Sequence, residues 1–252
     1  MMTETMAYKG IKFRYADMLN EFRRMKSLAH IFLAPQCEGV LDQCCRTLES
    51  IRNSAAGPTH QFEISEEWPI KTADSQGEYR ASDKDAGAPV FATLSFRWGI
   101  RNPNRGLKRQ VEFHLVEEAT VSIRIFDAKT TELIAQWQIE AGDAQSPGCH
   151  FHAAMNQYGK TGLFPEWLKV PRLPTVLVTP MDGLEFLLGE LFQDRWEMTI
   201  SEDSENMSSW AKGQSNRLER ILKWKLEAIR KADTTPWMAL KKAKPDLELL
   251  TD

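Results

Sequence analysis

Strict alternation of apolar and polar residues between positions 90 and 155 constrains the fold of this chain more than any other feature. The alternating segments are "VFATLSFRWGI", "QVEFHLV", "TVSIRIF", "ELIAQWQIE" and "CHFHAAM". Turn-forming stretches such as "RNPNRG" and "GDAQSPG" separate them. A period of two with short connections is typical of antiparallel strands, so we predict a β-meander of four to five strands within residues 88–156. One face of this sheet is apolar throughout and must be covered by helices.

Two segments before the sheet have helical periodicity. Residues 16–33 and 38–53 carry apolar side chains three and four positions apart, and Pro35 lies between them. This pattern predicts a helical hairpin within residues 1–57.

Two helices are expected after the sheet. The sequence "TPMDGLEFLLGELFQDRW" begins with Thr179 as a cap and Pro180 at the first helical position, and its apolar stripe is wide. These features predict a long helix packed on the apolar face of the sheet. The last helix should run from about residue 204 to residue 232, with Leu222 and Leu226 on its buried side.

Together these segments define an α+β fold. We expect residues 1–252 to form one domain, with the helical hairpin in 1–57, the antiparallel sheet in 88–156 and the C-terminal helices in 179–232. The last of these helices should be basic. A chain of 252 residues with 42% hydrophobic content is large enough to bury a sizeable core.

Charge, cysteine content and missing motifs narrow the class of protein. The formal net charge of −3 gives no overall attraction to nucleic acid. The four cysteines form no C-x-x-C pair, the N-terminal residues are polar, and no segment approaches about 18 consecutive apolar residues. We therefore predict a cytoplasmic protein with free thiols and no membrane association. The motifs of P-loop NTPases, Rossmann enzymes, α/β-hydrolases and H-E-x-x-H metalloproteases are missing, which disfavours those classes.

The strand "CHFHAAM" places two histidines on one face. His150 and His152 are two residues apart, so both imidazoles should project from the polar face while Phe151 joins the apolar face. Arg124 on a neighbouring strand should share the polar face, and Arg172 lies between two prolines in the following connector, "VPRLP". The two histidines and the two arginines are our candidate catalytic residues.

Four interpretations of this histidine face remain open. It is a solvated sheet face, a metal half-site completed by His114, Glu112 or Glu140, a metal-free acid–base pair acting on a phosphodiester, or a binding face for an acidic ligand. In the acid–base interpretation, Arg124 or Arg97 would stabilise the developing charge. No second cluster with metal-ligand spacing supports the metal interpretation, so we assign no metal ligands and predict no cofactor.

Basic residues concentrate near the C-terminus. Between Arg217 and Lys244 there are nine Lys and Arg against three Asp and Glu. Such a surplus is either the solvated face of an amphipathic helix or a docking patch for an acidic partner. The residues that we assign to partner binding are Lys223, Trp224, Arg230, Lys231, Lys241 and Lys242. We expect a protein partner, with nucleic acid as the alternative partner of the same helix.

The motifs "IRIFD", "HFH", "VPRLP" and "TPMDGLEFLLGELFQDRW" follow one another between residues 120 and 196. This order resembles that of small prokaryotic families of unassigned function, some of which occur in toxin–antitoxin or phage-defence settings. The resemblance marks His150, His152 and Arg172 as shared polar positions. Toxin-like members are usually shorter and lack the N-terminal hairpin and the basic tail, so this chain departs from a free-standing toxin.

Two functional hypotheses follow. The first is an accessory or interaction protein of a prokaryotic defence or toxin–antitoxin system, supported by the missing catalytic signatures and the uneven charge. The second is a small phosphodiesterase or ribonuclease, metal-free or metal-assisted, that uses His150 and His152 with Arg124 or Arg172. We place the interaction protein first and leave enzymatic activity open.

Overall fold

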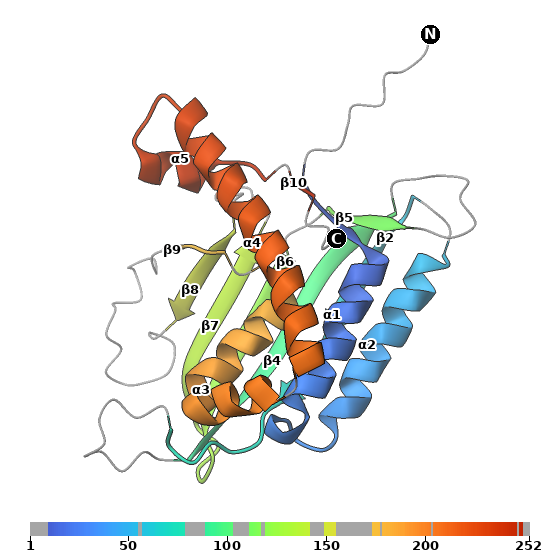
Figure 1. Ribbon diagram of the computed structural model, residues 1–252, viewed down its shortest axis with the longest axis vertical. Coiled ribbons are helices and arrows are strands. Elements are labelled where there is room, and N and C mark those ends of the chain that lie inside the picture. The colour runs from blue at the N-terminus through green and yellow to red at the C-terminus, as the bar shows by residue number, and fades with distance from the viewer. Residues whose placement is uncertain are drawn as a thin grey trace.

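The computed structural model describes residues 10–54, 57–78, 89–102, 111–116, 119–141, 149–154, 173–176, 178–202, 204–245 and 247–248. Within these ranges ten strands form one largely antiparallel sheet, and the helices lie across one of its faces (Figure 1). The predicted α+β class with an antiparallel sheet is therefore confirmed.

The long strand β4 (Val90–Arg101) is the centre of the sheet. One edge of β4 pairs with β6 (Ala119–Asp127), followed outward by β7 (Leu133–Ala141), β8 (His150–Ala154) and the short β9 (Leu173–Pro174). All of these pairings are antiparallel. The alternation in β4 is as predicted, because its even-numbered apolar residues are all buried: Val90, Ala92, Leu94, Phe96, Trp98 and Ile100.

The strand order differs from the predicted meander at β5 (Glu112–Leu115). This strand pairs with Ile100 and Arg101 of β4, whereas β6 pairs directly with residues 90–97 of the same strand. Because β2 pairs with residues 96–101 from the other side, β5 and β6 must occupy the same edge of β4. The prediction that β5 separates β4 from β6 is therefore wrong, and the two strands follow one another along β4.

Several short strands extend the sheet beyond the predicted range. β2 (Thr59–Ile64) and β3 (Ile70–Lys71) pair with the second edge of β4. β1 (Ile11–Arg14) pairs with β5, and β10 (Leu247–Glu248) adds to β1 in parallel. Segments of two to six residues carry too little periodicity to be recognised as strands, so they were not predicted.

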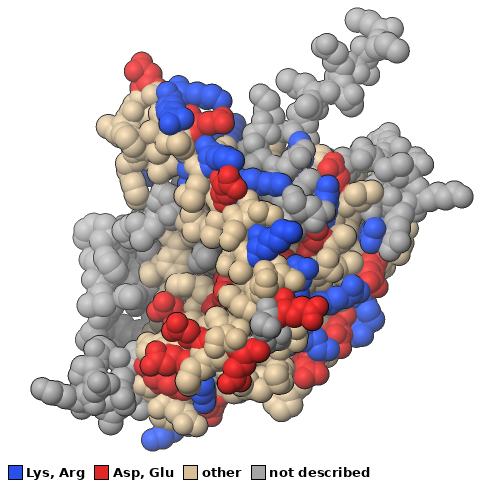
Figure 2. All heavy atoms as spheres, viewed as in Figure 1, with Lys and Arg blue, Asp and Glu red and all other residues tan. Residues whose placement is uncertain are grey.

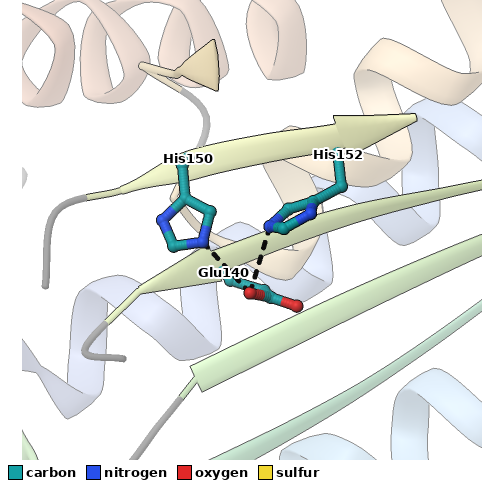
Figure 3. Close-up of side chains that lie close together, drawn as sticks. All are labelled: Glu140, His150 and His152. Atoms are coloured by element: carbon teal, nitrogen blue, oxygen red, sulfur yellow. Dashed lines mark hydrogen bonds and ion pairs between the residues drawn. The ribbon is translucent and has the colours of Figure 1, made fainter. Parts of the chain in front are cut away.

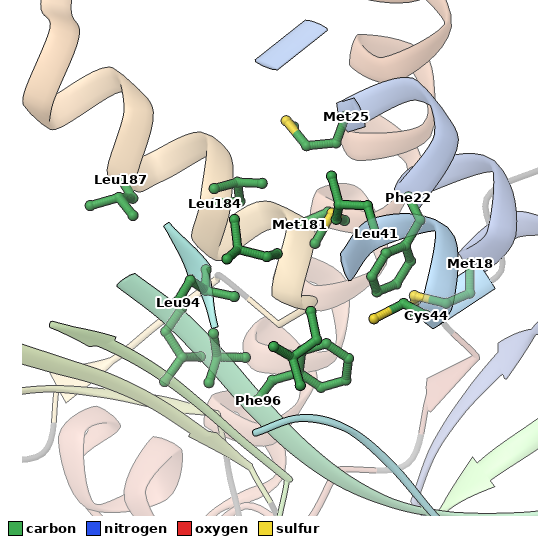
Figure 4. Close-up of a cluster of buried hydrophobic side chains, with 14 of the residues drawn as sticks. Met18, Phe22, Met25, Leu41, Cys44, Leu94, Phe96, Met181, Leu184 and Leu187 are labelled. Carbon is green, nitrogen blue, oxygen red and sulfur yellow. The ribbon is translucent and has the colours of Figure 1, made fainter. Parts of the chain in front are cut away.

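Three helices cover the apolar face of the sheet. α1 (Tyr15–Ala29) and α2 (Cys37–Arg52) form the predicted hairpin, joined through a 3-10 turn at residues 30–32. α3 (Pro180–Glu202) also begins as predicted. The backbone N–H of Asp182 donates to the hydroxyl of Thr179, and the backbone N–H of Thr179 donates to the carboxylate of Asp182, each over 3.0 Å. The first part of α3 packs closely on the sheet, and Figure 4 shows its leucines facing the apolar side chains of β4.

α4 (Ser204–Lys231) lies over the other helices, and its C-terminal part projects from the body together with α5 (Pro236–Lys242) (Figure 1). Its buried face is narrower than predicted. Leu222 and Leu226 were expected to be buried, but they are 55% and 46% exposed. That prediction is wrong because the helix extends past the layer that would cover these side chains.

A buried ion cluster connects three of the helices. The guanidinium of Arg217 in α4 contacts the carboxylates of Asp182 in α3 and Glu21 in α1, and all three side chains are at least 94% buried. The four cysteines are free thiols, as predicted. Among the described helices, none combines the length and the apolar content needed to cross a membrane.

Candidate functional site

The two candidate histidines lie on β8 and face a glutamate of the neighbouring strand. Residues two apart on a strand share a face, which places His150 and His152 together, as the sequence predicted. In the pairing of β7 with β8, Glu140 lies opposite His150 and Gln138 lies opposite His152. The regular strand geometry thus brings three functional side chains to one point on the polar face.

Both imidazoles approach the same oxygen of Glu140 (Figure 3). Nε2 of His150 donates a hydrogen bond of 3.0 Å to Oε2 of Glu140. Nε2 of His152 lies 3.2 Å from that oxygen, and the two ring centroids are 4.8 Å apart. We call Glu140, His150 and His152 the histidine–glutamate cluster.

This cluster is buried, unlike the solvated sheet face that was one of the interpretations. The side chains of His150, Glu140 and His152 are 5%, 11% and 12% exposed. The adjacent imidazoles of His150 and His152 hold the pKa of the Glu140 carboxyl well below its usual range, although burial acts in the opposite direction. Glu140 is therefore a buried carboxylate anion beside two imidazoles.

A polar pocket of about 180 Å³ lies next to the cluster on the same face of the sheet. Thr120 is directly opposite Glu140, and Gln138 is directly opposite His152, so the pocket and the cluster share a border. The residues that β4, β6 and β7 contribute to this pocket are Ser95, Phe96, Arg97, Thr120, Ser122 and Gln138. Residues 63–66, at the end of β2 and after it, form the remaining wall. The pocket is thus lined by strand neighbours of the cluster and not by its three residues.

The predicted arginines have different positions. Arg124 lies on the polar face as expected, but its guanidinium forms an ion pair of 2.6 Å with Glu66. Arg97, on the same face, pairs similarly with Glu63 at 3.0 Å. Arg172 lies outside the described residues.

Of the three residues proposed to complete a metal site, only Glu140 is beside the histidine pair. His114 and Glu112 lie on β5, where Nε2 of His114 is 3.4 Å from Oε1 of Glu112. Along β4, His114 lies opposite Arg101, whereas Thr120, the partner of Glu140, lies opposite Arg97, so the two positions are about 13 Å apart in the strand direction at about 3.3 Å per residue. His114 therefore shares the polar face of the sheet with His150 and His152, as expected, but it lies too far along the strands to be a third ligand beside them.

Most residues assigned to partner binding lie on the projecting end of α4 and on α5, where Figure 2 shows a concentration of basic side chains. Arg230, Lys241 and Lys242 are exposed. Lys223 and Lys231 are also exposed but pair with Glu219 and Glu227 one turn earlier in the helix. Trp224 is half-buried, packs against the core and also lines a pocket of about 460 Å³ together with Lys231 and Lys242.

Sequence reasoning assigned no site role to the residues that surround the cluster. Thr120, Ser122 and Gln138 had a detectable signal, because each occupies a polar position in an alternating strand. Their proximity to His152 depends on the register across the turns between β6, β7 and β8, and no sequence pattern reports that register.

Two kinds of chemistry are available to the histidine–glutamate cluster. Two imidazoles and a carboxylate can transfer protons as a general acid and a general base. The same three donors can also bind a transition-metal ion, for which two histidines and one carboxylate are a known ligand set. No protein-family model matches the sequence, and comparisons with curated proteins and with solved structures find no significant match.

Proposed function

We propose that this protein is a hydrolase that cleaves phosphodiester bonds at the histidine–glutamate cluster. The observation that supports this proposal is the convergence of two imidazoles on one buried carboxylate oxygen, beside a polar pocket on the same sheet face. Buried clusters of titratable side chains beside a pocket are the arrangement expected of a catalytic centre. This proposal places the enzymatic hypothesis ahead of the interaction protein.

The reaction is the addition of water to a phosphodiester. The cluster would accept a proton from water, the water oxygen would form a bond to phosphorus, and the bond from phosphorus to the leaving oxygen would break. The proton would then pass to the leaving oxygen, so the reaction balances with water as the only co-reactant. Arg124 and Arg97 lie on the same face. Their guanidinium groups could leave Glu66 and Glu63 and bind the phosphate oxygens of the substrate instead.

Incubation of the purified protein with labelled single-stranded RNA and DNA tests the proposal. Cleavage should occur in the wild type and should fall at least 100-fold in Glu140→Gln and in His152→Ala. The matched control is His114→Ala, which removes the imidazole of the other histidine–glutamate pair in the sheet and should leave cleavage unchanged. A wild type that cleaves neither polymer, with or without added divalent ions, would exclude this activity.

A second proposal concerns the projecting end of α4 with α5. Three large apolar side chains are exposed there, Leu222, Leu226 and Trp237, among the basic residues described above. Mixed apolar and basic surfaces are suited to an acidic partner, either a protein or a nucleic acid. We propose that this surface docks such a partner, as an accessory protein of a defence or toxin–antitoxin system would require.

A further inference from the structure

Two donor separations in the histidine–glutamate cluster match those of ligands that share a single ion. Oε2 of Glu140 lies 3.0 Å from Nε2 of His150 and 3.2 Å from Nε2 of His152, and one donor atom from each residue lies within 4.8 Å of the other two. Two donors about 2.1 Å from one tetrahedral or octahedral ion are about 3.0–3.4 Å apart. We infer that Glu140, His150 and His152 bind one divalent transition-metal ion. The inference rests on the proposed function for the role of the ion, and it revises our expectation of no cofactor.

The orientation of His152 favours an ion over a simple hydrogen bond. Its Nε2 atom is buried and has no hydrogen-bond partner among the described residues, although Oε2 of Glu140 is only 3.2 Å away. The ring is therefore turned so that its N–H direction misses that oxygen. If an ion lay about 2.1 Å from both Nε2 of His152 and Oε2 of Glu140, the direction from Nε2 to the ion would make an angle of about 40° with the line from Nε2 to Oε2. To coordinate such an ion, the lone pair of Nε2 of His152 must point at the ion and not at Oε2 of Glu140. The observed orientation of the ring meets this requirement.

Burial and charge also favour a bound cation. The side chains of Glu140 and His150 are 11% and 5% exposed, and the ion pairs of Glu140 within the described ranges are those with the two imidazoles. A buried carboxylate is costly unless a positive charge compensates it. A divalent ion supplies that charge and leaves both imidazoles neutral, which is the form in which histidine binds metals.

The position of the cluster in the sheet keeps the three donors together before an ion binds. His150 and His152 are two residues apart on β8, and Glu140 lies directly opposite His150 on β7. β7 pairs on its other side with β6, so the strand that carries Glu140 is held from both edges. A ligand set on paired strands is more rigid than one on loops, which lowers the cost of ordering the site.

The donor set also determines which ions would bind. Two imidazoles with one carboxylate suit Zn²⁺, Fe²⁺, Co²⁺ or Ni²⁺, whereas Mg²⁺ and Ca²⁺ prefer oxygen donors. Three protein ligands leave at least one coordination position for water, as in catalytic rather than structural zinc sites. A zinc-bound water ionises near pH ~7, so the ion would supply the hydroxide that attacks the phosphodiester. His150 and His152 would then act as ligands, and the bound hydroxide would act as the nucleophile.

Metal binding can be measured independently of activity. Full-length protein without a histidine tag would be treated with EDTA, dialysed, and titrated with ZnSO₄, CoCl₂ and MgCl₂ by calorimetry, with zinc content measured by mass spectrometry. We expect one Zn²⁺ or Co²⁺ per chain, no Mg²⁺ binding, and an increase in the melting temperature with Zn²⁺. A wild type that takes up no zinc in the titration and shows no increase in melting temperature would overturn the inference.

Variants locate the site. Glu140→Gln keeps the shape of the side chain, and His152→Gln alters the most exposed of the three ligands, so both should fold; near-UV circular dichroism would check this. Each should bind Zn²⁺ at least 10-fold more weakly, while His114→Ala should bind it as the wild type does. Unchanged zinc affinity in Glu140→Gln and His152→Gln would place the ion elsewhere, for example on a cysteine thiolate, and would overturn the assignment.

The two proposals fail in different ways. The wild type could bind one zinc ion per chain and the two variants none, while the wild type cleaves neither RNA nor DNA. This result would support the metal site and contradict the hydrolase. Cleavage that persists in EDTA-treated protein containing no zinc would support the hydrolase and contradict the catalytic role of the ion, because the imidazoles would then act as acid and base themselves.

Discussion

The guanidinium of Arg217 is enclosed by three helices and is the most consequential charge in the core outside the candidate site. It contacts Asp182 and Glu21, and its Nε atom donates to Oδ2 of Asp182 over 3.1 Å. Asp182 also contributes to the cap of α3, so one arginine connects the start of α3 with α1 and α4. A buried arginine with two carboxylates is stabilising only while all partners are present.

Replacement of this arginine should therefore destabilise the protein strongly. Arg217→Met would leave two buried carboxylates without their cation, and we expect the free energy of unfolding to fall by about 3–5 kcal/mol. The matched control is Lys223→Met, which breaks an exposed pair with Glu219 on the same helix and should cause no measurable change. Urea denaturation followed by circular dichroism measures both. Equal stability of the two variants would mean that the buried cluster does not stabilise the fold.

Glu21 in the same cluster should make stability depend on pH. Burial raises the pKa of its carboxyl to about 7, against the lowering effect of Arg217, whereas the ordinary value is 4.5. The folded state then binds more protons than the unfolded state between these values, so the free energy of unfolding should decrease as pH rises from about 4.5 to about 7. Glu21→Gln should remove this part of the pH dependence. The test is urea denaturation of both proteins from pH 5 to pH 8, and a constant difference between them would contradict the raised pKa.

At the candidate site, the sequence predicts the pair of histidines but does not predict which residue contacts them. The shared face of His150 and His152 follows from the period of two, which is a local property of the strand. Glu112, Glu140 and His114 were equivalent candidates for the third position, because each is a polar residue of an alternating strand. The choice of Glu140 depends on the register between β7 and β8, which is a long-range property.

The same distinction holds for whole elements. α1, α2 and α4 begin and end within a few residues of their predicted bounds, and α3 begins at its predicted residue, because caps, prolines and apolar spacing act locally. The relation of β5 to β6 was predicted wrongly, because an alternating segment can turn back beside its predecessor or continue along an earlier strand. Both arrangements have the same apolar pattern, so only the pairing with β4 distinguishes them.

The contact between α3 and the sheet gives a prediction at this scale. A Cβ atom at Gly183 would lie 3.2 Å from Cδ1 of Ile139 and 3.3 Å from Cγ1 of Val121. Gly183→Leu should therefore push α3 away from the sheet and lower the free energy of unfolding by about 1–3 kcal/mol. Gly39→Ala in α2 is the control, because no atom lies within 4 Å of its Cβ position, and it should raise stability by up to about 1 kcal/mol. Thermal denaturation of both variants would show opposite shifts, and shifts of the same sign would contradict the packing argument.

Across the whole molecule, opposite charges gather on different helices. Figure 2 shows acidic side chains clustered over α3 and basic side chains along the projecting part of α4 and α5. The basic surplus predicted from the sequence is partly neutralised, since Arg217 is buried and Lys223 and Lys231 pair with glutamates. The remaining basic charge lies on the helices, which cover the apolar face of the sheet (Figure 1), whereas the histidine–glutamate cluster lies on the polar face, so the proposed docking and the proposed catalysis would use separate surfaces.

This separation leads to the last prediction. A triple variant, Arg230→Glu with Lys241→Glu and Lys242→Glu, should bind single-stranded RNA more weakly than the wild type in fluorescence anisotropy. The slope of the logarithm of RNA affinity against the logarithm of salt concentration should also be shallower. We expect a decrease of about 0.7 for each phosphate that the variant no longer neutralises. Lys212→Glu is the control, because Lys212 is an exposed lysine in the earlier half of α4 and should leave RNA affinity nearly unchanged. The triple variant should still bind zinc with the stoichiometry of the wild type, because its substitutions are on helices that do not contribute to the histidine–glutamate cluster. If its RNA affinity and salt slope equal those of the wild type, the basic end of α4 and α5 is a solvated helix surface and does not bind RNA.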